Sequence, residues 1–202
     1  FTETQIEEII KRFKPDVLCL QESRLNSGEL AEKKYKIKKH TLVGTSGDIY
    51  SESRLNYVER TGLATLITNN LTKNMIQIKG KNQYMNTNFL ELDSENAIII
   101  ANCYFPTLGG KKNYQKQFEE ATKELIRQVR ETRDPNGKKY KSIKALAMGD
   151  FNFCIHSHSR YKKRTEQMKD MIYELDGTYH IPDMPTHKSR AHKKWSYLDG
   201  LI

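Results

Sequence analysis

The apolar run 144–152 ends in Gly149-Asp150-Phe151-Asn152, which carries the side chains best suited to chemistry. If the run is a strand, alternate side chains share one side. Asp150 and Asn152 would then address one point beyond its end, while Phe151 turns into the core. A carboxylate and a carboxamide aimed at one point suit a hard cation or a phosphate oxygen. Gly, Asp and Asn also favour ordinary turns, so these residues alone leave a site and a turn equally open.

Two further apolar runs end in polar side chains. The run 17–20 is followed by Glu22, and the run 97–104 ends at Tyr104, two residues before Pro106, which forbids further ladder pairing. An isolated Glu22 would be interpreted as a solvated loop residue. Three polar groups that each follow an apolar run are harder to attribute to chance turns. The pattern therefore favours one site built from several strand ends.

Helices and strands alternate along the chain and must position these groups. Apolar residues at helical spacing predict helices over 4–13, over 114–132 and around Met168, Met171, Ile172 and Leu175. Thr4 and Glu7 are expected to form a capping box at the first helix. Further strands are expected over 62–68, 75–78, 89–92 and 195–202, with a basic edge strand near 33–39. Interleaved elements with hairpin-like strand pairs predict a single α/β domain over residues 1–202 with a mixed sheet.

The 202 residues include 34 Lys and Arg against 25 Asp and Glu, a formal net charge of +9. This charge favours a polyanionic partner, although a solvated lysine-rich surface is equally open. Cys19, Cys103 and Cys154 form neither a CxxC pair nor an even set, which predicts a reducing, intracellular compartment, nuclear or cytoplasmic. The apolar runs are too short to cross a bilayer, so we expect no membrane partner, and we expect a monomer.

Four segments in order resemble the endonuclease/exonuclease/phosphatase superfamily, the group of DNase I, exonuclease III, apurinic/apyrimidinic endonucleases and non-LTR retrotransposon endonuclease domains. The matching segments are 15–23 (PDVLCLQES), 102–106 (NCYFP), 149–152 (GDFN) and 195–199 (WSYLD). The resemblance implies a four-layer α/β sandwich of two packed mixed sheets flanked by helices, with the site at one end of the sheets.

The resemblance also implies roles for the strand-end residues. Glu22 resembles the carboxylate that holds the divalent ion, normally Mg²⁺ (or Mn²⁺). Asp150 resembles the group that orients or deprotonates the attacking water, and Asn152 its partner on the phosphate. Tyr104 resembles the tyrosine near the scissile phosphate, and Asp199 the aspartate that orients a catalytic histidine.

The chain departs from the family pattern in three places. The family has an asparagine on a strand before the first helix and a histidine beyond the Asp199 region, and neither has a counterpart here. Thr107 stands where many endonucleases have asparagine. We therefore expect a fragment truncated at both ends, inactive as given and marginally stable.

The basic loops that follow the functional strand ends favour nucleic acid, most of all DNA, as the partner. The residues expected to contact phosphate are Lys111, Arg160, Lys162, Arg164, Lys188 and Arg190. A Mg²⁺-dependent endonuclease that nicks DNA, of the retrotransposon type, is the leading hypothesis. The alternatives are a phosphoinositide or lipid phosphatase of the same superfamily and a catalytically dead nucleic-acid-binding module.

Overall fold

The computed structural model describes residues 2–23, 25, 30, 37, 39–45, 62–80, 84–106, 114–132, 137, 139–152, 162–180, 187–188, 195–196 and 199–202. At residues 114, 187–188, 195–196 and 199–201 the description covers the backbone alone. The expected basic strand near 33–39 lies outside these residues except at positions 37 and 39.

Two sheets make up the centre of the molecule. The first is antiparallel with strand order β1-β3-β2, where β1 is Val17–Leu20, β2 His40–Thr45 and β3 Leu63–Thr68. The second has the order β10-β7-β6-β5-β4, with strands Asp199–Leu201, Ser142–Asp150, Asn96–Tyr104, Met85–Glu91 and Ile76–Ile78. Within it β6 and β7 are parallel and the other neighbours antiparallel. A two-stranded ribbon pairs β8 (His187–Lys188) with β9 (Trp195–Ser196).

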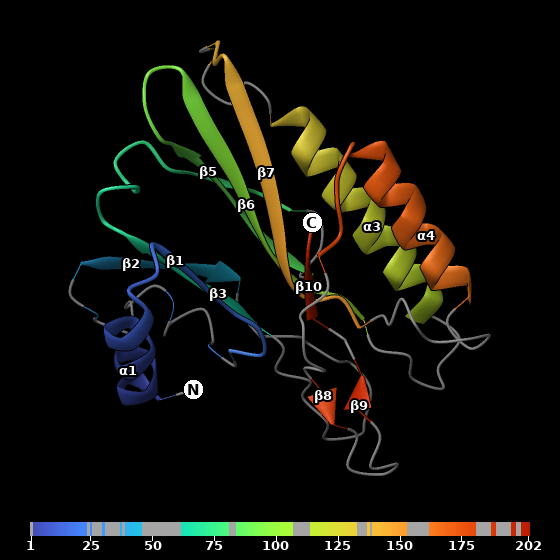
Figure 1. Cartoon of the computed structure of the whole chain (residues 1–202), viewed down its shortest axis with the longest axis horizontal. Coiled ribbons are helices and arrows are strands. Elements are labelled where there is room, and N and C mark those ends of the chain that lie inside the picture. Colours follow the sequence, from blue (N-terminus) through green and yellow to red (C-terminus); the bar gives the residue numbers. More distant parts are fainter. Residues whose placement is uncertain are drawn as a thin grey trace.

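Helices cover the outer faces of both sheets (Figure 1). Helix α1 (Glu3–Phe13) covers the three-stranded sheet, and α3 (Tyr114–Glu131) and α4 (Lys162–Glu174) lie side by side on the five-stranded sheet. Each layer boundary has its own apolar cluster. Ile6 packs with Leu66 beneath α1, Ile67 with Ile100 between the sheets, and α3 and α4 pack on the second sheet through a cluster that includes Phe118.

This arrangement is the four-layer α/β sandwich that the family resemblance implies. One detail differs: among the described strands only the five-stranded sheet is mixed, because β1, β2 and β3 pair antiparallel throughout. No described helix is long and apolar enough to cross a membrane.

The capping box of α1 lies two residues earlier than expected. Thr2 Oγ1 accepts from the backbone N–H of Gln5 at 3.3 Å, and the Thr2 N–H donates to Gln5 Oε1 at 2.9 Å. Glutamine fills the third helical position as well as glutamate does, so the sequence offered two overlapping boxes. The helix ends at Phe13, and its C-cap residue Lys14 has a left-handed φ of 48°.

Two expected strands also differ from the observed ones. The expected strand 89–92 is the second half of β5, which begins at Met85 and includes buried polar residues that broke the apolar pattern. The expected strand 195–202 is divided into β9 and β10, which belong to different sheets. In addition, Lys162 and Arg164, expected in a loop, lie in the first turn of α4.

Candidate active site at the ends of β1, β6 and β7

Glu22 and Tyr104 come from different sheets and meet in a hydrogen bond. Glu22 follows β1 in the three-stranded sheet, and Tyr104 is the last residue of β6 in the five-stranded sheet. The Tyr104 Oη–H donates to Glu22 Oε1 at 2.5 Å. Glu22 is exposed and has a left-handed φ of 49°, which turns the chain out of β1. An exposed carboxylate is thereby held at the end where both sheets finish.

Asp150 joins this pair through the parallel register of β6 and β7. Tyr104 lies opposite Asp150, and the Phe105 N–H donates to the Asp150 carbonyl at 2.8 Å. The Asp150 side chain is oriented by its own turn, because Oδ1 accepts from the Asn152 N–H at 2.8 Å. Glu22, Tyr104 and Asp150 therefore occupy one edge of the molecule, as the strand-end pattern predicts.

Asn152 takes a different position from the one expected. The strand ends at Asp150, and Asn152 has a φ of 48°, so the period-two argument fails there. Asparagine tolerates this left-handed conformation better than most residues. Its side chain is 8% exposed and donates from Nδ2 to the Phe105 carbonyl at 2.7 Å. Asn152 thus ties the turn after β7 to the turn after β6, while Phe151 is fully buried as predicted.

Gly149 is required by the close approach of β6 to β7. Its φ is +144°, and a Cβ there would lie 2.0 Å from the carbonyl oxygen of Cys103 on β6. The glycine before Asp150 therefore allows the pairing that brings Asp150 beside Tyr104.

The backbone of β10 brings Asp199 to the same end of the sheet. Asp199 pairs with Asp150 in the antiparallel register of β10 and β7, and Gly200 pairs with Gly149. Asp199, which the family resemblance places at the site, is therefore a direct backbone neighbour of Asp150.

Arg164 is buried, so the expectation that it contacts phosphate is wrong. The residue is 1% exposed, and its Nη1 donates to the carbonyls of Pro106 at 2.7 Å and Asn152 at 3.2 Å. Its guanidinium carbon lies 4.3 Å from the ring centroid of Phe118, a cation–π contact. Arg164 thus connects α4 to the turns after β6 and β7.

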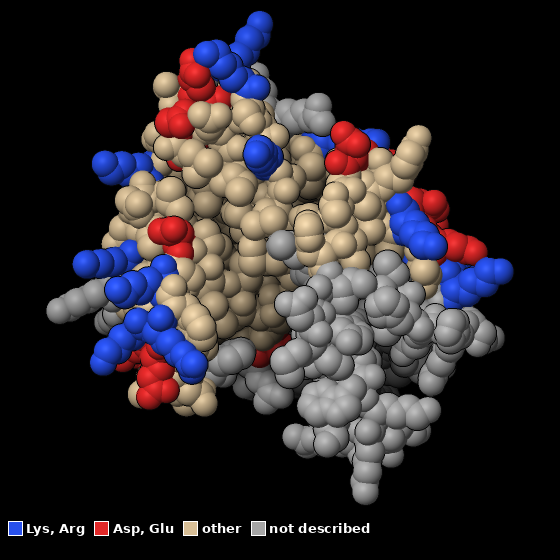
Figure 2. Space-filling view, in the orientation of Figure 1, with Lys and Arg blue, Asp and Glu red and all other residues tan. Residues whose placement is uncertain are grey.

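The other residues expected to contact phosphate are only partly described. Lys162 is exposed in the first turn of α4. Lys188 is part of β8, where the structure describes the backbone alone. Lys111, Arg160 and Arg190 lie outside the described residues. In Figure 2 the described basic side chains are spread around the margin of the face shown, and its centre is largely uncharged.

Asn102, noted in the sequence only as part of the segment 102–106, lies between the two sheets next to the site. It is fully buried in β6, and its Nδ2 lies within hydrogen-bond distance of the Leu20 and Ala64 carbonyls. Gln21 Nε2 donates to Asn102 Oδ1 at 2.7 Å. The available signal was an asparagine inside the apolar run 97–104, where an unpaired amide would be unfavourable.

Two thiols lie beneath the site and are held in the neutral form. Burial raises the pKa of Cys19 to about 12, against a small opposing hydrogen bond with Thr65. Burial, and secondarily Cys19 itself, raises the pKa of Cys103 well above its usual range. Thiolate chemistry is therefore disfavoured here, in agreement with core roles for both residues.

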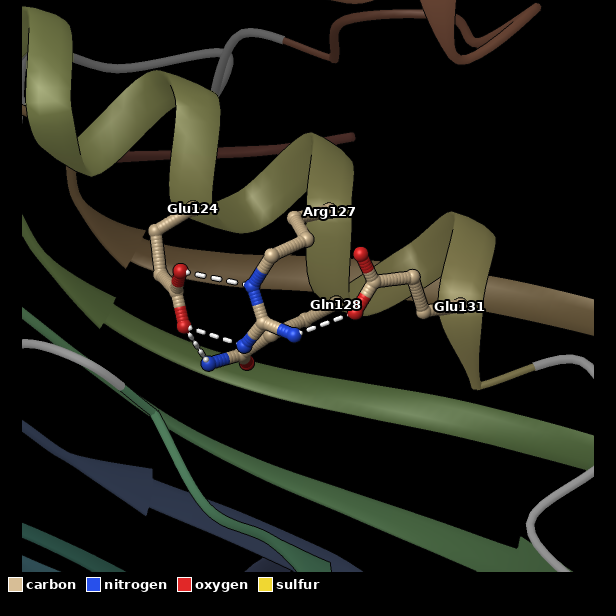
Figure 3. Close-up of polar contacts among 4 residues, drawn as sticks. All are labelled: Glu124, Arg127, Gln128 and Glu131. Carbon is tan, nitrogen blue, oxygen red and sulfur yellow. Dashed lines mark hydrogen bonds and ion pairs between the residues drawn. The ribbon is translucent and has the colours of Figure 1, made fainter.

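A buried acid on α3 has a structural explanation and lies apart from the strand ends. The Glu124 side chain accepts two hydrogen bonds from Arg127, at 2.7 and 2.9 Å, and one from Gln128 at 2.8 Å (Figure 3). Arg127 also pairs with Glu131, and the bonds to Glu124 raise the pKa of Arg127. Glu124 is therefore neutralised within its own helix.

The donors at the strand ends suit a magnesium ion better than a transition metal. Among the described residues, no group of three or more His, Cys, Asp or Glu side chains could enclose a metal. Mg²⁺ needs no such cage, because it keeps several waters and is commonly held by one or two carboxylates. The exposed Glu22 carboxylate, oriented by Tyr104, fits that requirement.

Comparisons with known proteins identify the family and the fold. The model of the endonuclease/exonuclease/phosphatase family matches residues 2–199. The AP endonuclease LMAP from Leishmania major has a TM-score of 0.70 and 14% identity, covering 98% of this chain and 72% of that one. The 3′ phosphatase NExo from Neisseria, bound to a product DNA hairpin, has a TM-score of 0.64 and 12% identity. The match covers 98% of this chain and 79% of that one. The endonuclease domain of TRAS1, a telomere-specific non-LTR retrotransposon, has a TM-score of 0.57 and 16% identity. The match covers 98% of this chain and 76% of that one. At these identities the structures show a common fold. No curated protein matches.

Proposed function

The chain belongs to the endonuclease/exonuclease/phosphatase family, and from this premise we propose that it is a Mg²⁺-dependent phosphodiester hydrolase that nicks DNA. The family consists of nucleases and phosphatases, so hydrolysis at phosphorus is the general expectation. The observation that carries the proposal is the meeting of Glu22, Tyr104 and Asp150 at one edge from two separate sheets. Carboxylates and a hydroxyl that meet at the ends of strands from two sheets suit the hydrolysis of a phosphate ester. This interpretation explains their meeting better than an ordinary turn does.

Glu22 is the residue proposed to hold the divalent ion. Its carboxylate is exposed, and Oε1 already accepts from Tyr104, which fixes the orientation of the group. When bound, Mg²⁺ would supply positive charge that neutralises phosphate oxygens. Tyr104 then has a supporting role: its hydroxyl holds the carboxylate and lies where the phosphate is proposed to bind.

Asp150 is the residue proposed to orient the attacking water and accept its proton. Its Oδ1 is held by the Asn152 N–H, which leaves the carboxylate pre-oriented before substrate binds. A carboxylate is a weak base in bulk water and becomes effective when the water is positioned against it. Asp199, paired with Asp150 across β10 and β7, is proposed to orient a further catalytic group in the same edge.

Three observations support DNA as the substrate. The net charge of +9 favours a polyanion. Lys162 is exposed in the first turn of α4, close in sequence to Arg164, which contacts the turn after β7. Finally, the similar structures include an AP endonuclease, a phosphatase bound to a DNA hairpin and a retrotransposon endonuclease domain.

The substrate class is tested by supplying three substrates to the protein at its natural length, each with Mg²⁺ and with EDTA. The substrates are supercoiled plasmid, a DNA hairpin with a 3′ phosphate, and vesicles that contain phosphoinositide. We expect relaxed plasmid in Mg²⁺ alone. Phosphate release from the hairpin or the vesicles without plasmid nicking would identify a phosphatase instead. DNA binding that depends on salt, without hydrolysis of any substrate, would identify a binding module.

A further inference from the structure

The proposed site depends on a fixed distance between two sheets. Glu22 follows β1 in one sheet, whereas Tyr104 and Asp150 belong to the other. Strand pairing fixes positions only within a sheet, and apolar packing between sheets is not directional. Directional contacts between the end of β1 and β6 are therefore needed to place the Glu22 carboxylate.

Asn102 makes those contacts. Its Nδ2 lies 3.2 Å from the Leu20 carbonyl, 3.0 Å from the Ala64 carbonyl and 3.2 Å from Thr65 Oγ1, all in the opposite sheet. Its Oδ1 accepts from Gln21 Nε2 at 2.7 Å. The residue is fully buried, so each bond forms in a low dielectric and is expensive to lose.

Asn102 and Tyr104 of β6 contact successive residues at the end of β1. Asn102 and Tyr104 are two residues apart in β6, so their side chains lie on the same side of that strand. Asn102 contacts Leu20 and Gln21, and Tyr104 contacts Glu22. Three consecutive residues at the end of β1 are thereby held by two residues of one strand.

We propose that Asn102, together with Gln21, is a positioning residue that places the Glu22 carboxylate for a divalent cation. The inference rests on the proposed metal role of Glu22. Asn102 does not touch the cation; it fixes the backbone from which Glu22 leaves β1 with a left-handed φ. Loss of such a supporting hydrogen bond typically weakens metal binding by about 10- to 100-fold.

Asn86 provides a matched control in the same polar layer. It lies opposite Asn102 in the pairing of β5 and β6, and it is also buried at 2% exposure. Its Oδ1 accepts from Thr65 Oγ1 at 2.9 Å and from Asn88 Nδ2 at 3.0 Å. None of these partners belongs to β1, so its loss should reduce stability without moving Glu22.

The test is Mn²⁺ binding in the absence of DNA. Binding is measured as the decrease in the EPR signal of free Mn²⁺. The proteins are wild type, Glu22→Gln, Asn102→Ala, Gln21→Ala and Asn86→Ala, each checked by circular dichroism and a thermal melt. Glu22→Gln should remove the site. Asn102→Ala should raise its Kd by about 10-fold or more, and Gln21→Ala should raise it less. Asn86→Ala should lower Tm and leave the Kd unchanged.

The outcomes separate this inference from the proposed function. An unchanged Kd in folded Asn102→Ala overturns the positioning role, as does an equal rise in Asn86→Ala. If Asn102→Ala does not fold, an unchanged Kd in Gln21→Ala overturns it, because Gln21 is only partly buried and its loss removes one bond to Asn102. If Glu22→Gln binds Mn²⁺ like wild type, the metal role of Glu22 is wrong, which is a separate failure.

Discussion

The Tyr104 hydroxyl donates a 2.5 Å hydrogen bond to Glu22 Oε1 and so connects the last residue of β6 to the residue that leaves β1. Neither side chain could reach the other if the two sheets were displaced along their strands. The bond therefore reports the relative position of the sheets at the site. It also gives a way to disturb the carboxylate without changing its charge.

Tyr104→Phe removes this bond and keeps the ring. The Glu22 side chain is exposed, so we expect the free energy of unfolding to change by less than about 1 kcal/mol. Metal-dependent hydrolysis should fall about 10-fold or more, because the carboxylate loses its orientation. Rates at several Mg²⁺ concentrations and a urea titration measure the two effects. Tyr173→Phe on the exposed side of α4 is the control and should change neither.

Gly149→Ala places a Cβ 2.0 Å from the Cys103 carbonyl oxygen, and it adds a side chain at a φ of +144°. The loss of stability should exceed about 3 kcal/mol, since strain and overlap add. Gly137 has a φ of +67° with nothing within 4 Å of an added Cβ, so Gly137→Ala measures the cost of a left-handed φ without steric overlap. That variant should lose about 1 kcal/mol. Equal losses in the two variants would show that β6 and β7 can separate at Gly149.

Arg164 and Lys162 both lie in the first turn of α4, and their substitutions should have different effects on stability and on DNA binding. Arg164→Met leaves the carbonyls of Pro106 and Asn152 without their buried donor and should lower the free energy of unfolding by about 2–3 kcal/mol. Lys162→Ala, at an exposed position, should change stability by less than about 0.5 kcal/mol. It should instead weaken DNA binding and lower the slope of log K against log salt by about one. Melting curves and salt titrations of DNA binding distinguish the two residues.

Alkaline pH should destabilise the fold through the two buried thiols. Their folded pKa values are raised above the ordinary 9.0, so the stability they contribute is fully present below pH 9. It is lost as pH rises from there through the folded pKa values, by about 1.4 kcal/mol per pH unit for each thiol, because only the unfolded chain releases these protons. Urea titrations at several pH values from 8 to 11 give the free energy of unfolding as a function of pH. This free energy should fall less steeply with pH in a Cys19→Ala/Cys103→Ala variant than in wild type. An equal fall in both proteins would mean that the folded thiols ionise normally.

The strand-end residues could be found from sequence because each follows a visible apolar run. Glu22, Tyr104 and Asp150 are close in space for the reason that the sequence suggested: their strands end at one edge. Phe151, predicted in the core, is fully buried. The layers were also predictable, since each helix carries a clear apolar face and the motif order resembles the family.

Residues whose role depends on distant partners could not be found in this way. Arg164 looked like part of a basic loop, because nothing local indicates that Pro106, 58 residues earlier, supplies its acceptor. The cross-sheet role of Asn102 and the polar half of β5 were missed for the same reason. The Asn102 amide contacts the Ala64 carbonyl of the other sheet, and Asn86 accepts from Thr65 Oγ1 of that sheet. Asn152 was misplaced because the strand ends at Asp150, and alternation holds only inside a strand.

The central claim is that Asp150 and Glu22 act on a phosphodiester with a divalent ion. It is tested most directly by plasmid nicking with the protein at its natural length, comparing wild type with Asp150→Asn and Glu22→Gln in Mg²⁺. Asparagine at 150 can still accept the hydrogen bond from the Asn152 N–H, so the turn should survive while the charge is lost. We expect wild type to nick and EDTA to stop it, and both folded variants to lose at least about 100-fold in rate. Nicking by either variant at the wild-type rate would contradict the account.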